Sequence, residues 1–149
     1  KLLDALDIHN DELVLDIGSG LGYSSAIISL IAEVVIAVED DSSLASEAEE
    51  ILSEIGVDNV VVQIGKLEDG APEHGPYDVI ILQGGVGDIP GSILNQLKNG
   101  GRIGAIFIEE GLGTAKIGFK LNNKITWRYS FNAAAPILPG FSKQKDFVL

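Results

Sequence analysis

Three alternating glycines, Gly18, Gly20 and Gly22, stand between an apolar run at 13–17 and a helix-like segment that begins at Tyr23. Glycine is favoured where the backbone approaches a ligand closely or takes a positive φ angle. At a strand-to-helix turn, the free N–H groups of the first helical turn also attract anionic or polar ligand atoms. The spacing therefore predicts a nucleotide-binding loop, with an ordinary structural turn as the alternative.

Two carboxylates narrow the choice of nucleotide. The dinucleotide fingerprint has its third glycine three residues after the second, where this chain has Tyr23. Asp16, just before the loop, disfavours a pyrophosphate but suits a ligand with an ammonium group. Glu39 ends the next apolar run, where a carboxylate can accept hydrogen bonds from both hydroxyls of a ribose. Asp40 beside it is a further candidate contact; the alternative is that both are solvated charges at a helix entry.

A ligand with a ribose, an amino-acid head and no phosphate fits this pattern, and S-adenosylmethionine is such a ligand. Its other parts must meet the ends of later strands, because ligands of open α/β sheets lie at the carboxyl ends of the strands. Lys66 and Leu67 follow the third apolar run and are expected to flank the adenine. Gln83 follows the fourth and is expected to face the methionine part.

Apolar runs alternate with amphipathic segments along the chain, which predicts an α/β fold with a doubly wound, mostly parallel sheet. Strands are expected at 13–17, 34–38, 60–64, 77–82 and 102–108, and helices at 23–32, 42–55 and 89–98. Residues 116–121 and 125–131 alternate around the turn at 122–124, which predicts an antiparallel C-terminal hairpin. A short last strand is expected at 147–149. We expect residues 1–149 to form one domain.

Composition excludes several classes of protein. The formal charge of −12, from 22 acidic and 10 basic residues, disfavours nucleic acid and anionic membranes as partners. The chain has no cysteine, which removes disulfides and thiolate chemistry. No cluster of metal ligands is recognisable. No apolar leader opens the sequence, so we expect a cytoplasmic protein. The absence of methionine favours a chain that lacks an upstream segment.

Four phrases, LDIGSGLGYSSA, GVDNVVVQIG, PYDVIILQGG and LNQLKNGGRI, resemble the protein-L-isoaspartate O-methyltransferases, which are class I methyltransferases. The similarity covers roughly residues 2–110. It implies a mostly parallel seven-stranded sheet and S-adenosylmethionine as methyl donor, with S-adenosylhomocysteine as product. It further implies a protein or peptide substrate that carries isoaspartate, methylated on its α-carboxylate. By motif, the donor loop is Asp16, Gly18, Ser19, Gly20 and Gly22, and the ribose acid is Glu39.

The sequence differs from the family's usual pattern at two places, and a third feature of the family, an upstream segment, is expected to be missing. Lys66 stands where the family usually has an aspartate, and residues 83–87 replace an alanine-rich loop. By this resemblance, the family's substrate-recognition segment lies upstream of the first strand, and we expect residues 1–149 to lack it. A small-molecule methyltransferase, a non-catalytic S-adenosylmethionine-binding module and a nicotinamide oxidoreductase therefore stay open as alternatives. No catalytic residue is assigned, because a carboxylate acceptor is already ionised at neutral pH; His9 and His74 are interpreted as solvated loop residues.

Overall fold

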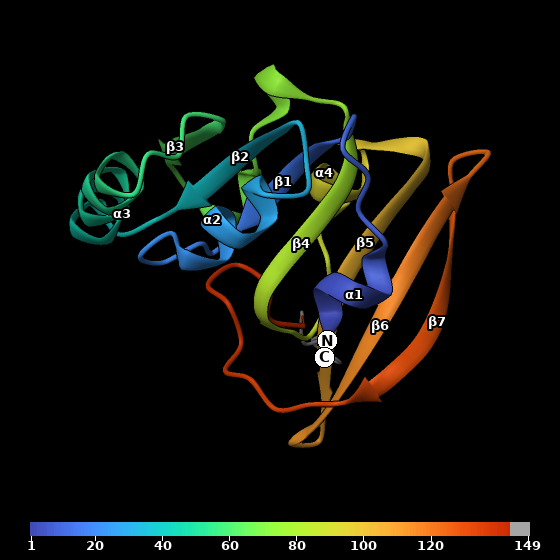
Figure 1. Ribbon diagram of the computed structural model, residues 1–149. Coiled ribbons are helices and arrows are strands. Elements are labelled where there is room, and N and C mark those ends of the chain that lie inside the picture. The colour runs from blue at the N-terminus through green and yellow to red at the C-terminus, as the bar shows by residue number, and fades with distance from the viewer. Residues whose placement is uncertain (144–149) are drawn as a thin grey trace.

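A computed structural model of the chain describes residues 1–143. One seven-stranded sheet has the strand order β3-β2-β1-β4-β5-β6-β7 (Figure 1). The helices are α1 Leu2–Leu6, α2 Tyr23–Ser29, α3 Ser42–Glu54 and α4 Gly91–Leu94, with a 3₁₀ turn η1 at Leu67–Asp69 and another, η2, at Pro72–His74. The strands are β1 Leu13–Ile17, β2 Val34–Glu39, β3 Val60–Ile64, β4 Tyr77–Val86, β5 Leu97–Glu109, β6 Leu112–Leu121 and β7 Lys124–Asn132.

The strand pairing confirms the predicted fold class. Strands β1 to β5 pair in parallel, whereas β6 is antiparallel to both β5 and β7 at one edge of the sheet. The predicted turn at 122–124 closes the β6–β7 hairpin, and Asn122 and Asn123 both adopt positive φ angles there. The strand expected at 147–149 lies outside the described residues. No helix within residues 1–143 is long and apolar enough to cross a membrane.

The boundaries around β5 differ from the sequence prediction. The helix expected at 89–98 is a single turn, α4, because the chain enters β5 at Leu97, which pairs with Tyr77 of β4. Lys120 of β6 stabilises this early exit, since its ammonium group donates to the carbonyl oxygens of Leu94 and Leu97 at 2.9 and 2.8 Å. Helix α2 is also shorter than expected and ends at Ser29.

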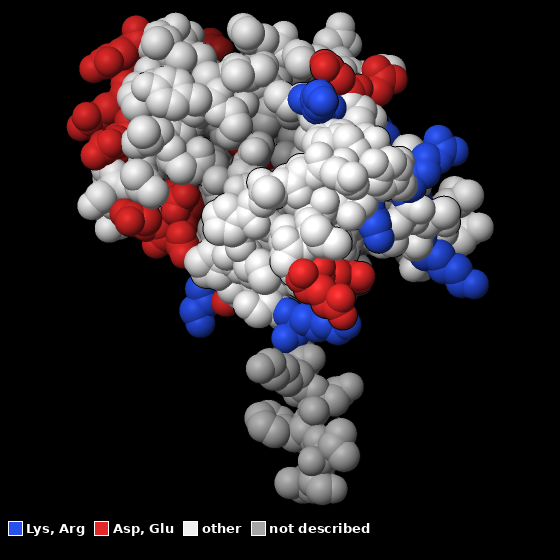
Figure 2. Space-filling model, turned by 90° about the horizontal axis from the view of Figure 1, so that it is seen from below, with Lys and Arg blue, Asp and Glu red and all other residues white. Residues whose placement is uncertain are grey.

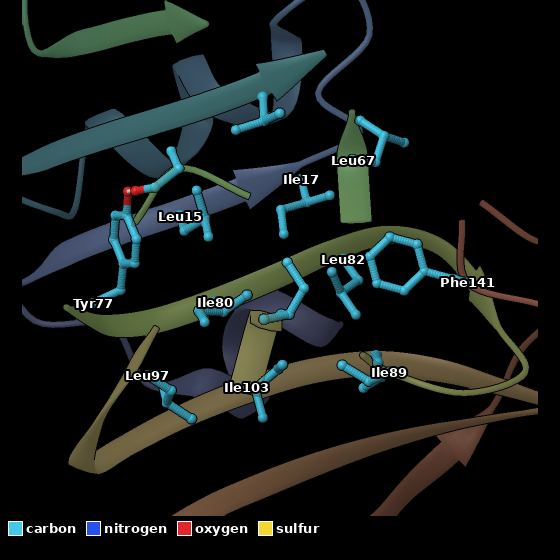
Figure 3. Packing of buried hydrophobic residues seen from close by; sticks show 14 of the residues in the cluster. Leu15, Ile17, Leu67, Tyr77, Ile80, Leu82, Ile89, Leu97, Ile103 and Phe141 are labelled. Atoms are coloured by element: carbon cyan, nitrogen blue, oxygen red, sulfur yellow. Dashed lines mark hydrogen bonds between the residues drawn. The ribbon is translucent and has the colours of Figure 1, made fainter. Parts of the chain in front are cut away.

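Apolar side chains fill both faces of the central strands. On one face, Leu15 and Ile17 of β1 pack in a cluster with Ile80 and Leu82 of β4 (Figure 3). On the other face, a second cluster combines the central strands with α1 and α2. Burial on both faces explains why these strands read as continuous apolar runs. The core thus holds the carboxyl ends of β1, β2 and β4 in fixed positions.

One ion pair joins the N-terminal residues to β5. Arg102 donates to both carboxylate oxygens of Glu12, at 2.9 and 2.6 Å, and also to the backbone carbonyls of Leu6 and Asp7. Burial acts to raise the pKa of Glu12. The hydrogen bonds from Arg102 and from the His9 N–H outweigh it, so the pKa of Glu12 lies below its usual value of 4.5. The ionised carboxylate therefore stabilises the fold.

A pH dependence of stability follows from that lowered pKa. Stabilisation by Glu12 is complete above the pKa it has in the unfolded chain and is lost as the pH falls through the lower folded pKa. The wild type should therefore be more stable than Glu12→Gln at pH 7, and the difference should shrink below about pH 4.5. Urea denaturation between pH 7 and pH 3 measures it. Glu33→Gln removes an exposed carboxylate and should change little; a pH-independent Glu12→Gln difference would contradict the expectation.

Candidate functional site

The glycine loop joins β1 to α2 with left-handed backbone at all three glycines. The φ angles of Gly18, Gly20 and Gly22 are 79°, 58° and 90°. A Cβ atom on Gly22 would lie 3.1 Å from the Cβ of Ala48 in α3, so Gly22 also permits close packing of the two helices. A Cβ atom on Gly20 would meet no atom within 4 Å. The space beside Gly20 is therefore open.

Ser19 carries the clearest sign of a missing partner. Its hydroxyl oxygen is buried and has no hydrogen-bond partner, and it is the only such buried side-chain atom within residues 1–143. Buried polar groups are almost always hydrogen-bonded, and exceptions commonly mark binding sites or unplaced solvent. The loop backbone is fixed nearby, since the N–H groups of Gly18 and Ser19 both point to the Val38 carbonyl, at 2.9 and 3.3 Å. The Ser19 hydroxyl thus has hydrogen-bonding capacity that no described residue satisfies.

Glu39 lies directly against the loop, as the sequence predicts. Its carboxylate is 5% exposed and accepts the Gly20 N–H on Oε1 and the Asp41 N–H on Oε2, each at 2.9 Å. A carboxylate has about four acceptor positions, so two remain for ribose hydroxyls. Asp40 is exposed at the start of α3, outside this pair of bonds. Glu39 therefore both shapes the loop and offers acceptors to a ligand.

Asp16 is completely buried and surrounded by protein donors. Its carboxylate accepts hydrogen bonds from the hydroxyls of Ser25 and Ser24, at 2.6 and 2.9 Å, and from the Gln83 amide at 2.9 Å. Burial raises the pKa of Asp16, and the three hydrogen bonds oppose that shift only in part. Asp16 thus ties the first turn of α2 to Gln83, which lies inside β4 and not after it as predicted, because β4 continues to Val86. Ser24 and Ser25 were not predicted as site residues, although the two serines that follow the glycines were an available signal.

The residues predicted to flank the adenine follow β3. The Gly65 N–H donates to the Glu39 carbonyl at 3.1 Å, which brings this segment to the end of β2. Lys66 is exposed at the start of η1. Leu67 is 2% exposed and packs in the core near Phe141 (Figure 3). Contacts of Lys66 and Leu67 with a nucleotide remain predictions.

A segment that the sequence analysis left without a role crosses the site. After β7, residues 133–141, here called the strap, return toward β4 (Figure 1). The Gly85 N–H donates to the Pro136 carbonyl at 2.7 Å, and the Leu138 N–H donates to the Gly85 carbonyl at 2.9 Å. The Leu138 side chain lies so close to Gly18 and Gly84 that Cβ atoms there would be 3.2 and 2.6 Å from it. The strap is therefore a wall of the glycine-loop site.

Comparisons with known proteins point to one family. The family model "Protein-L-isoaspartate(D-aspartate) O-methyltransferase (PCMT)" matches residues 1–124. The protein-L-isoaspartate O-methyltransferases of Syntrophus aciditrophicus and Brucella anthropi are 41% and 44% identical to the chain over 102 residues, which are 68% of this chain and 47% of each relative. The chain thus spans about half the length of the curated relatives that it matches.

Solved structures agree with this result. A protein-L-isoaspartate O-methyltransferase superposes with a TM-score of 0.87 and 26% identity, over 93% of this chain and 45% of that one. A putative protein-L-isoaspartate O-methyltransferase from Plasmodium falciparum, in complex with S-adenosyl-L-homocysteine, gives a TM-score of 0.72 at 18% identity, over 92% of this chain and 69% of that one. The second likeness is one of fold. The comparisons confirm the resemblance found in the sequence.

Proposed function

The chain belongs to the protein-L-isoaspartate(D-aspartate) O-methyltransferase family, and from this membership we propose that it binds S-adenosylmethionine and methylates the α-carboxylate of isoaspartyl residues in proteins or peptides. The observation that carries the proposal is that one loop holds both an unpartnered Ser19 hydroxyl and a Gly20 N–H bonded to the Glu39 carboxylate, with open space beside Gly20. These groups fit a ligand that has ribose hydroxyls and further polar atoms but no phosphate.

The named residues have distinct parts in holding the donor. Glu39 would accept hydrogen bonds from the ribose hydroxyls, and the Ser19 hydroxyl would bond to a polar atom of the ligand in the loop. Gln83, held within β4 by its hydrogen bond to Asp16, would contact the methionine part. Asp40, Lys66 and Leu67 complete the proposed contacts. Residues 1–149 would thus act as one donor-binding domain, and we infer a cytoplasmic protein without nucleic-acid or membrane partners.

The reaction requires alignment more than proton transfer. When bound, S-adenosylmethionine supplies a methyl group on a positively charged sulfur, and a carboxylate oxygen can take that group without first losing a proton. The C–O bond forms as the C–S bond breaks, and the electron pair of the broken C–S bond stays on the sulfur. The chain's contribution is to hold donor and acceptor in line and to exclude water. Leu138, an apolar wall beside Gly18, is suited to exclude water from the donor.

Methyl transfer to a matched pair of peptides tests the proposal. The protein is incubated with methyl-labelled S-adenosylmethionine and either an isoaspartyl peptide or its aspartyl twin, and base-labile methyl ester is counted. Binding of S-adenosylhomocysteine is measured separately by calorimetry. We expect label on the isoaspartyl peptide alone. Binding without label on either peptide would contradict the proposed acceptor, and absence of binding would contradict the donor site as well.

A further inference from the structure

A site-sized hollow lies apart from the glycine loop. It is a cavity of about 610 Å³ beside the turn between β5 and β6, within the size range of small-ligand sites. Phe107 and Leu112 supply apolar lining, and the end of the chain described, at Lys143, forms part of the rim. We call it the β5–β6 cavity. No step of donor binding described above uses it.

The position of the cavity relates it to the donor site. The loop that holds Ser19 follows the carboxyl end of β1, and the carboxyl ends of parallel strands meet at one edge of a sheet. The β5–β6 cavity lies at the carboxyl end of β5, where Phe107 pairs with Val86 of β4. A Cβ atom on Gly87 would lie 2.6 Å from the Lys143 nitrogen, so the rim also contacts the loop after β4. A molecule in the cavity would therefore lie on the β4–β5 side of the donor.

The two ends of the cavity carry opposite charges. Lys116 stands at one end, half-buried, with its ammonium group 5.1 Å from the centre of the Phe107 ring. Within residues 1–143, Lys116 forms no ion pair with a carboxylate. Glu109 and Glu110 stand at the other end, exposed at the turn. Lys116 is four residues along β6 from Leu112, which pairs with Glu109. The two ends are thus about 13 Å apart at ~3.3 Å per residue.

The distribution of charge over the surface also favours the side of the molecule that holds β6 and β7 as the place for an anionic group. Figure 2 shows Asp and Glu side chains gathered over α3 and Lys and Arg side chains on the opposite side, where β6 and β7 lie. Lys116 belongs to this basic part of the chain, since β6 and β7 also carry Lys120, Lys124 and Arg128. A ligand with one negative and one positive group can satisfy both ends of the cavity.

We propose that the β5–β6 cavity binds the polypeptide next to the methylated residue, as an extended segment whose acidic side chain lies at Lys116 and whose basic side chain lies at Glu109 and Glu110. Four residues of extended chain span the same distance of about 13 Å. The apolar floor at Phe107 and Leu112 accommodates the residues between. This inference rests on the proposed function for its link to methylation, but the peptide preference itself is a binding property.

Binding of short peptides tests the inference without methyl transfer. Fluorescent five-residue peptides carry an acidic residue at one end and a basic residue at the other, and are compared with their reversed twins and with neutral versions. Fluorescence anisotropy is recorded with the whole chain in saturating S-adenosylhomocysteine. We expect one charged order to bind at least tenfold more tightly than the neutral peptide, and 500 mM salt to weaken that binding, because salt screens exposed charges.

Variants identify the responsible ends. Lys116→Gln should lose about tenfold in affinity for the preferred peptide, whereas Lys124→Gln, which removes a positive charge from the exposed hairpin turn, should not. The double variant Glu109→Gln/Glu110→Gln should lose the preference for the basic side chain. It provides a second test if Lys116→Gln folds poorly. Equal binding of all peptides, or an unchanged preference in Lys116→Gln, would overturn the inference. Selective binding without methylation would support the cavity and contradict the proposed function.

Discussion

Phe141→Ala is expected to lower the free energy of unfolding by about 3–5 kcal/mol, the usual cost of truncating a buried phenylalanine. Phe141 is fully buried and inserts from the end of the strap into the cluster that holds Leu82 (Figure 3). Its carbonyl also accepts the N–H groups of Gly87 and Asp88, at 2.7 and 3.1 Å. Urea denaturation measures the change, and the melting temperature should fall by about 10 °C or more.

A neighbouring residue provides the control for that prediction. Ile137 lies in the same strap but is 42% exposed, so Ile137→Ala should cost about 1 kcal/mol or less. The same experiment shows whether the strap supports the donor loop, since loosening Phe141 should also loosen Leu138 against Gly18. Weaker binding of S-adenosylhomocysteine by Phe141→Ala is therefore expected. A loss of stability equal to that of Ile137→Ala would show that Phe141 does not anchor the strap.

Glu39→Gln is expected to weaken the binding of S-adenosylhomocysteine by roughly 100-fold. The amide has one acceptor atom where the carboxylate has two, so either Gly20 or Asp41 would face an NH₂ group with its own N–H. The ribose hydroxyls would in addition lose a charged acceptor, and a hydrogen bond to a charged group contributes about 1.5–3 kcal/mol. Isothermal titration calorimetry measures the affinity.

A matched change of charge separates local from general effects. Glu49→Gln removes one negative charge from the exposed face of α3 and should leave the affinity within about twofold of the wild type. Thermal unfolding of both variants shows whether Glu39→Gln still folds. An affinity of folded Glu39→Gln equal to that of Glu49→Gln would contradict the assignment of Glu39 to the ribose.

The parallel half of the fold was predictable because burial leaves few choices. The runs 13–17 and 34–38 are apolar apart from Asp16, and both are buried on both faces, which is typical of strands in a covered parallel sheet. The start of β5 was not predictable in this way, since Leu97 suits the core in a helix or a strand. Lys120, distant in sequence, stabilises the strand conformation by donating hydrogen bonds to the carbonyls of Leu94 and Leu97.

The candidate site divides along similar lines. Gly20 and Glu39 were identifiable because strand ends in an open α/β sheet bring such residues together. In the structure, the Gly20 nitrogen lies 2.9 Å from Oε1 of Glu39. The strap was not identifiable, because residues 133–141 have no periodicity and dock through backbone bonds to Gly85 and through single side chains. The unusual glycines at 84 and 85 were the available signal, since the strap approaches too closely for a Cβ atom at either position.

The contact between Leu138 and the glycine loop gives the order of synthesis a role in this domain. The segment with Gly18 emerges from the ribosome before the strap, because Leu138 and Phe141 follow it far along the chain. Pairings of such high sequence separation form late in folding, because a long loop must close first. A nascent chain would hold a nearly complete sheet with an unfinished donor loop. Competence to bind the donor would then arise only when translation reaches the strap.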